Sequence, residues 1–97
     1  MAEPYKLPEA APRNLKDGKI KVKVFSPYQI YYQGEATSVS ALNKTGPFDV
    51  LYGHANFFSL LVAGQVVVRT GFIELKFPIN HGVMKVTGNL MTLFVDI

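Results

Sequence analysis

Few side chains in this sequence could take part in hydrolytic or group-transfer catalysis. Nucleophilic catalysis needs a nucleophile, a base and a group that orients the base. The chain has no cysteine, so a serine would be the nucleophile and His54 or His81 the base. The candidate serines are Ser26, Ser38, Ser40 and Ser59, and the candidate carboxylates are Asp49 and Asp96. No nucleophile elbow or other local motif brings them together, so we expect no catalytic residue.

Metal and phosphate sites have equally little support. A zinc site would have to combine His54 and His81 with carboxylates from separate loops, without a regular spacing. The tripeptide Lys44-Thr45-Gly46 lacks the upstream glycine of a phosphate-binding P-loop. We therefore expect neither a metal nor another cofactor.

One pattern could bind single-stranded nucleic acid, because basic side chains contact phosphates and aromatic rings stack on bases. The residues concerned are Lys19, Lys21, Lys23, Tyr28, Tyr31 and Tyr32. The alternative is structural: lysines on the solvent face of a first strand protect a sheet edge, and tyrosines are common in strands. A net charge of +3 is weak for a nucleic-acid binder, so we favour the structural interpretation.

The composition predicts one small globular domain behind a tail. The chain has 97 residues, of which 48% are hydrophobic, and no apolar run is long enough to span a bilayer. Pro4, Pro8 and Pro12 interrupt the first 18 residues, where neither a helix nor a strand ladder could propagate. We interpret residues 1–18 as a flexible tail and residues 19–97 as the domain. The chain begins without the basic and apolar segments of a signal peptide.

Alternating apolar residues predict strands through most of the domain. Ile20, Val22 and Val24 share one face, and the same alternation recurs in residues 73–79 and 91–97. Residues 28–41, 65–70 and 82–87 are rich in strand-forming types, and glycines from Gly34 to Gly88 occur where strands should bend or reverse. Residues 56–63 fit a short helix or a strand buried on both faces, and we favour the strand. Short strands without helical crossovers predict an all-β sandwich or barrel.

The segment from Gly46 to Leu61, read with the strands around it, resembles a known family. Tyr32-Gln33-Gly34, Gly53-His54-Ala55 and Val66-Val-Val-Arg-Thr-Gly71 follow in the order and spacing of the N-terminal domain of the ATP synthase epsilon subunit, called delta in mitochondria. Gly82-Val-Met-Lys-Val86 and Leu90-Met-Thr-Leu-Phe-Val-Asp96 are similar to its closing strand pair. The resemblance covers residues 19–97.

The resemblance implies a flattened β-sandwich of about ten short, mostly antiparallel strands. It implies a non-catalytic rotor subunit that binds the gamma subunit and the ring of membrane c subunits, and so helps to couple proton flow to ATP synthesis. By position, Ser26, His54 and Ser59 would face gamma. The segment that would reach the c ring consists of Leu42, Asn43, Lys44, Thr45, Gly46 and Pro47.

The chain departs from the family pattern at the segment that would reach the ring. Pro47 stands where relatives carry a carboxylate, and we expect Asp49 to compensate only partly because neighbouring strand positions point to opposite faces. Tyr52 and Asn56 replace the prolines that usually flank the Gly-His-Ala turn.

The chain also differs from most bacterial relatives at its two ends. It stops at Ile97, where they continue into a C-terminal helical hairpin, so we expect it to lack the autoinhibition that the hairpin performs. The proline-rich start is closer to the mitochondrial subunit, whereas the Gly-His-Ala turn is bacterial in kind. We expect a peripheral location on the cytoplasmic face of a bacterial inner membrane, with the mitochondrial matrix side as the alternative.

Overall fold

The structure, a computed structural model, describes residues 18–53 and 56–97, and the regular elements of this part are all β-strands. They are β1 (Ile20–Phe25), β2 (Ile30–Ala36), β3 (Ser38–Asn43), β4 (Gly46–Leu51), β5 (Phe57–Leu61), β6 (Gly64–Arg69), β7 (Glu74–Ile79), β8 (His81–Thr87) and β9 (Leu90–Asp96). No helix of this part of the chain is long and apolar enough to cross a bilayer. The predicted tail lies outside the described residues, apart from Gly18.

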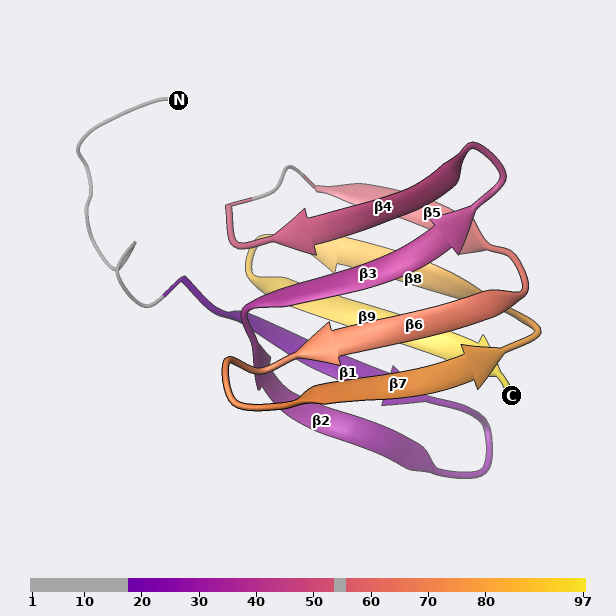
Figure 1. The fold of residues 1–97 in the computed structure, drawn as a ribbon, viewed down its shortest axis with the longest axis horizontal. Coiled ribbons are helices and arrows are strands. Elements are labelled where there is room, and N and C mark those ends of the chain that lie inside the picture. Colours follow the sequence, from indigo (N-terminus) through magenta and orange to yellow (C-terminus); the bar gives the residue numbers. More distant parts are fainter. Residues whose placement is uncertain (1–17, 54–55) are drawn as a thin grey trace.

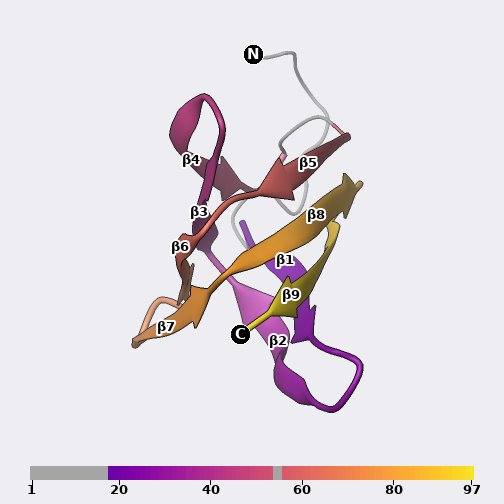
Figure 2. The ribbon, with the colours of Figure 1, turned by 90° about the vertical axis from the view of Figure 1, so that its right-hand side faces the viewer.

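Two sheets pack face to face (Figure 1, Figure 2). The five-stranded sheet has the order β2-β1-β9-β8-β5, and the four-stranded sheet has the order β4-β3-β6-β7. Neighbouring strands are antiparallel except β1 and β9, which run parallel from Lys21 opposite Leu90 to Phe25 opposite Phe94. The two layers confirm the prediction of an all-β sandwich with mostly antiparallel strands.

The core fills the space between the sheets and follows the period-two pattern of the sequence. Val22 and Val24 of β1 are buried and stand opposite Met91 and Leu93 of β9 in the parallel register. Val39, Val50, Val66 and Val68 supply the facing layer from the four-stranded sheet. Burying an aliphatic side chain of this size stabilises the fold by about 1.5–3 kcal/mol. The apolar residues that alternate in the sequence are therefore the residues that form the core.

The first strand is not an edge strand. β1 pairs with β2 on one side and with the C-terminal strand β9 on the other. The expectation that its lysines protect a sheet edge is therefore wrong, because β9 occupies the position that would have been exposed. Lys21 and Lys23 instead lie on the outer face of an interior strand.

The segment that could have been a helix is strand β5, as predicted, but it is not buried on both faces. Leu61 is buried, whereas Phe58 and Leu60 are each 64% exposed. β5 is the last strand of the five-stranded sheet, and no element of the described chain covers its outer face. The apolar composition of β5 therefore does not indicate burial.

Two glycines that the sequence placed at reversals lie inside strands. Gly34 is in β2 and Gly82 is in β8. A Cβ atom on Gly82 would lie 2.8 Å from the backbone carbonyl O of Phe94 and 3.3 Å from Val95 Cγ1. Gly82 is therefore explained by the close approach of β9 and not by a turn.

Candidate functional site

Ser26, predicted to face gamma, shapes the turn that follows β1. Its backbone N–H donates to the Gln29 carbonyl O at 2.9 Å. Its Oγ accepts from the backbone N–H groups of Tyr28 and Gln29 at 3.2 and 3.4 Å, and from the Tyr31 hydroxyl at 3.3 Å. A serine that binds amides further along the chain in this way stabilises a turn. Ser26 is half-buried, so part of it remains accessible.

The segment predicted to reach the c ring, residues 42–47, is the tight turn between β3 and β4. Asn43 stands opposite Gly46 in the strand register. Asn43 Oδ1 accepts from the Thr45 backbone N–H at 2.9 Å and from Thr45 Oγ1 at 2.6 Å. Gly46 has a φ of 127°, which residues with a side chain rarely adopt. Lys44 and Thr45 are exposed at the tip of the turn.

Ser59 contacts this turn. Asn43 Nδ2 donates to Ser59 Oγ at 3.3 Å, across the gap between the two sheets. Ser59 is half-buried, whereas its neighbours Phe58 and Leu60 point outward and are exposed. The structure therefore places a residue expected on the gamma side against the segment expected on the ring side.

The predicted residues do not form one cluster. In Figure 1 the β1–β2 turn, which contains Ser26, lies at the lower right and the β3–β4 turn at the upper right, and Figure 2 also draws them at opposite ends of the view. β4 ends and β5 begins at the left-hand end in Figure 1. His54 belongs to the connection between them and lies outside the described residues.

The carboxylate nearest in sequence to the segment predicted to reach the c ring is that of Asp49, and it lies on the same face of β4 as Pro47. Pro47 and Asp49 are both exposed on the outer face of β4, two residues apart, and Phe48 between them is half-buried. The expectation that the strand alternation separates these two positions is therefore wrong. Asp49 accepts a hydrogen bond from Ser40 Oγ on the neighbouring strand, so its carboxylate is already held against the sheet.

The structure does not assemble the lysine and tyrosine platform considered for nucleic acid. Lys21 and Lys23 occupy the outer face of β1. Tyr31 and Tyr32 pack against the core, with the Tyr31 ring 6.4 Å from the Phe77 ring, centre to centre. Of the three tyrosines, only Tyr28 is exposed, at 92%. The basic and aromatic groups therefore do not form one stacking surface.

A serine, a histidine and an aspartate do line one surface hollow of about 360 Å³, but without the geometry of a catalytic triad. His81 Nε2 lies 3.5 Å from Asp96 Oδ2, and both side chains are exposed. Ser26 Oγ is occupied by the three donors described above, and no hydrogen bond joins it to His81 within residues 18–53 and 56–97. Over the same residues, no cluster of three or more histidines, aspartates and glutamates could hold a metal ion.

An exposed apolar stripe crosses the outer face of the five-stranded sheet. Its members are Ile30, Phe25, Phe94, Val83 and Leu60, which lie side by side in the strand registers, together with Phe58. The Phe25 and Phe94 rings meet edge to face with centres 5.3 Å apart. Phe94 is 43% exposed and Ile30 is 52% exposed. This surface was not predicted from the sequence, although the two consecutive phenylalanines at 57 and 58 put an aromatic ring on each face of β5.

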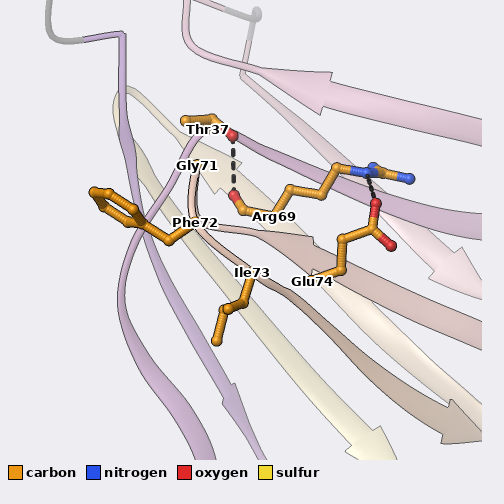
Figure 3. A pocket seen from close by; sticks show the side chains of 6 residues that line it. All are labelled: Thr37, Arg69, Gly71, Phe72, Ile73 and Glu74. Carbon is orange, nitrogen blue, oxygen red and sulfur yellow. Dashed lines mark hydrogen bonds and ion pairs between the residues drawn. The ribbon is translucent and has the colours of Figure 1, made fainter.

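The outer face of the four-stranded sheet is polar and internally paired. The Arg69 guanidinium donates from Nη1 to Ser40 Oγ at 2.6 Å and from Nε to Glu74 at 3.1 Å. Ser40 in turn donates to Asp49, so one network crosses all four strands. At the end of this face a shallow hollow of about 340 Å³ is lined by Thr37, Arg69, Gly71, Phe72, Ile73 and Glu74 (Figure 3). Thr37 Oγ1 donates to the Arg69 carbonyl O, so polar groups at this hollow are already satisfied.

These features describe a small β-sandwich with one paired polar face, one apolar face and no catalytic constellation in its described residues. The model of the family described as ATP synthase, Delta/Epsilon chain, beta-sandwich domain matches residues 19–97. The chain belongs to this family.

Curated relatives carry the same domain in longer chains. The ATP synthase epsilon chain of Francisella tularensis subsp. holarctica (strain FTNF002-00 / FTA) is 36% identical over 77 residues, which cover 79% of this chain and 53% of the relative. The ATP synthase epsilon chain of Helicobacter pylori (strain P12) is 36% identical over 77 residues and is covered to 63%. The chain thus spans between half and two thirds of these relatives.

Solved structures share the fold at low sequence identity. A chain in the central stalk and c-ring structure of the Tetrahymena thermophila mitochondrial ATP synthase matches with a TM-score of 0.70 and 16% identity, covering 81% of this chain and 64% of that one. A chain in the Euglena gracilis mitochondrial ATP synthase matches with a TM-score of 0.74 and 17% identity, covering 90% and 59%.

Proposed function

We propose that this chain is a central-stalk subunit of a rotary, proton-translocating ATP synthase. In this role it holds the gamma subunit to the c ring and helps to couple proton flow to ATP synthesis. The family match over residues 19–97 carries the proposal. The subunit is non-catalytic and peripheral, on the cytoplasmic face of a bacterial inner membrane or, as the alternative, on the matrix side in mitochondria.

The architecture suits a coupling element. Two sheets enclose one close-packed core, and close-packed interiors transmit strain because they have little compressible space. Torque applied at one surface of such a body reaches another without being absorbed by internal rearrangement. A stiff adaptor between two moving parts needs this property.

The assignment of surfaces to partners rests on two groups of residues. The β3–β4 turn presents the exposed Lys44 and Thr45 at one end of the sandwich, where short polar loops of a ring of subunits could meet it. Ser26, His54 and Ser59 remain the residues proposed for the gamma side. Residues 42–47 remain the segment proposed for the c-ring side.

Binding to the gamma subunit tests the proposal. The full chain is mixed with the gamma subunit of the same organism at micromolar concentration and purified through a tag on one partner. The proposal predicts a stoichiometric complex that survives size-exclusion chromatography. Absence of a complex at these concentrations would contradict it.

A further inference from the structure

The surface hollow beside the end of β9 is rich in aromatic rings. Its volume of about 360 Å³ is within the range of small-molecule sites. Tyr28 from the β1–β2 turn, Tyr31 from β2 and Phe94 from β9 all line it. The turn and the end of β9 lie near each other at the lower right of Figure 1. This hollow, called the β9 hollow below, therefore brings together rings from distant segments of the chain.

The fold positions two of these rings and leaves the third exposed. Phe94 is 43% exposed, and the Phe25 ring meets it edge to face with the centres 5.3 Å apart. Tyr31 is half-buried, and its hydroxyl donates to Ser26 Oγ at 3.3 Å. Tyr28 is 92% exposed, so nearly the whole of its side chain is accessible at the margin of the β9 hollow.

The charges at the β9 hollow favour a cation over an anion. Asp96 supplies a carboxylate, whose Oδ2 lies 3.5 Å from His81 Nε2, and both side chains are exposed. Among the residues that the structure describes, no lysine or arginine lines this hollow. Lys23 lies over the adjacent Phe25 ring, with Nζ 5.0 Å from the ring centre, and is not part of the lining. With an uncharged His81 imidazole, the described lining therefore carries one negative charge and no positive one.

Two other surface hollows have a different lining. The hollow at Phe72 also contains a carboxylate, but Glu74 accepts from Arg69 Nε at 3.1 Å, so a bound cation would compete with the guanidinium. A hollow of about 370 Å³ on the five-stranded sheet is lined by Lys21 and Lys23, which would repel a cation. Within the described part of the chain, neither of these two hollows is lined by more than one tyrosine or phenylalanine ring.

We propose that the β9 hollow binds an organic ammonium group, with Tyr28 and Phe94 supplying aromatic faces and Asp96 supplying the opposite charge. Aromatic faces attract cations because their electron density is highest there, and quaternary ammonium groups are bound in this way by aromatic cages. The inference goes beyond the proposed function and does not depend on it, because the lining comes from this chain alone.

Choline and its uncharged isostere 3,3-dimethyl-1-butanol separate a cation site from a merely apolar hollow. NMR titration of the full chain at pH 8, where free imidazole is uncharged, follows the ring protons of Tyr28 and Phe94. We expect choline to bind with a millimolar Kd and the alcohol to bind about threefold more weakly or less tightly still. Equal binding of the two compounds, or no response to choline, would overturn the proposal.

Two similarly exposed aromatic residues provide matched variants. Tyr28→Ala removes a ring from the β9 hollow, and Phe72→Ala removes one from the other aromatic hollow. We expect Tyr28→Ala to raise the Kd for choline about threefold or more, and Phe72→Ala to change it less than about 1.5-fold. Asp96→Asn should raise the Kd about twofold to threefold, with a smaller effect in high salt, whereas Glu74→Gln should leave it nearly unchanged. Urea unfolding of each variant shows that the fold is retained.

Capped trimethyllysine carries the same head group on a peptide backbone. Comparing its Kd with that of choline distinguishes a modified protein from a small molecule as the source of the ammonium group, and the tighter binder identifies the source. Similar losses of choline affinity in the Tyr28 and Phe72 variants would overturn the assignment to the β9 hollow. An unchanged Kd in both Tyr28→Ala and Asp96→Asn would do the same.

Discussion

Gly82 lies where strands β8 and β9 approach too closely to leave room for a side chain. In the sequence it opens the predicted strand 82–87 and resembles a glycine at a reversal, and only the structure shows that it is buried in β8 against the backbone of Phe94. Because the contact lies between residues on different strands, the local sequence carries no trace of it. Asn43 is similar, since its contact with Ser59 joins residues sixteen positions apart.

Substitution of the two in-strand glycines tests this explanation. Gly82→Ala should lower the free energy of unfolding by about 1–3 kcal/mol, because the added Cβ meets a backbone atom that cannot move independently. Gly34→Ala should cost less, because the nearest atom is the Tyr32 hydroxyl at the end of a side chain. Urea unfolding measures both. Equal losses, or a larger loss for Gly34→Ala, would contradict the account.

Asn43 should hold the β3–β4 turn mainly through its acceptor oxygen. Asn43→Ala removes the hydrogen bonds from Thr45 as well as the donor to Ser59, and should speed hydrogen exchange of the Thr45 amide about fivefold to tenfold, a change of about 1 kcal/mol. Asn43→Asp keeps the acceptor and loses only the donor, so the Thr45 amide should remain protected. NMR-detected exchange separates the two contacts, and equal exchange in both variants would refute the assignment.

The strands themselves were largely predictable, and their arrangement was not. Alternation in residues 20–24 and 91–95 reports which side chains face the core, because neighbouring residues of a strand point to opposite faces. Strand order depends on pairing between distant segments, such as the parallel alignment of β1 with β9. The prediction therefore mistook an interior strand for an edge and an exposed edge strand for a buried one.

Edge strand β5 should make the isolated chain prone to self-association. β4 and β7 carry Pro47 and Pro78, and β2 carries Glu35, whereas β5 has neither proline nor charge. Phe58→Lys should reduce self-association in sedimentation velocity at high concentration without lowering the free energy of unfolding, since Phe58 is exposed. Leu51→Lys on β4, where Pro47 already interrupts the edge, is the control. A similar gain from both changes would show that edge pairing through β5 is not the cause.

The polar network on the four-stranded sheet should depend on Arg69 more than on its carboxylate partner. Arg69→Met removes the hydrogen bonds to Ser40 and Glu74 together and should lower the free energy of unfolding by about 1–2 kcal/mol. Glu74→Gln removes one exposed ion pair and should cost less than about 1 kcal/mol, decreasing further in salt. Thermal or urea unfolding at two salt concentrations measures both. A larger loss for Glu74→Gln would place the stabilisation in the ion pair instead.

At the scale of the whole molecule, the two outer faces and one end divide the surface by chemistry. The four-stranded sheet carries a hydrogen-bonded network around Arg69, the five-stranded sheet carries an exposed apolar stripe, and the β3–β4 turn presents polar groups at one end. The strand order shows which side chains share the outer face of each sheet, and the sequence pattern alone does not.

Reconstitution of a stripped enzyme tests the rotor role most directly. Membrane vesicles of the same organism, depleted of the native subunit, are supplied with this chain, and ATP synthesis driven by a proton gradient is measured. The account predicts that the chain binds the enzyme at about one copy per complex and restores synthesis sensitive to uncoupler. Vesicles that bind no chain, or that bind it and remain as uncoupled as before, would contradict the claim.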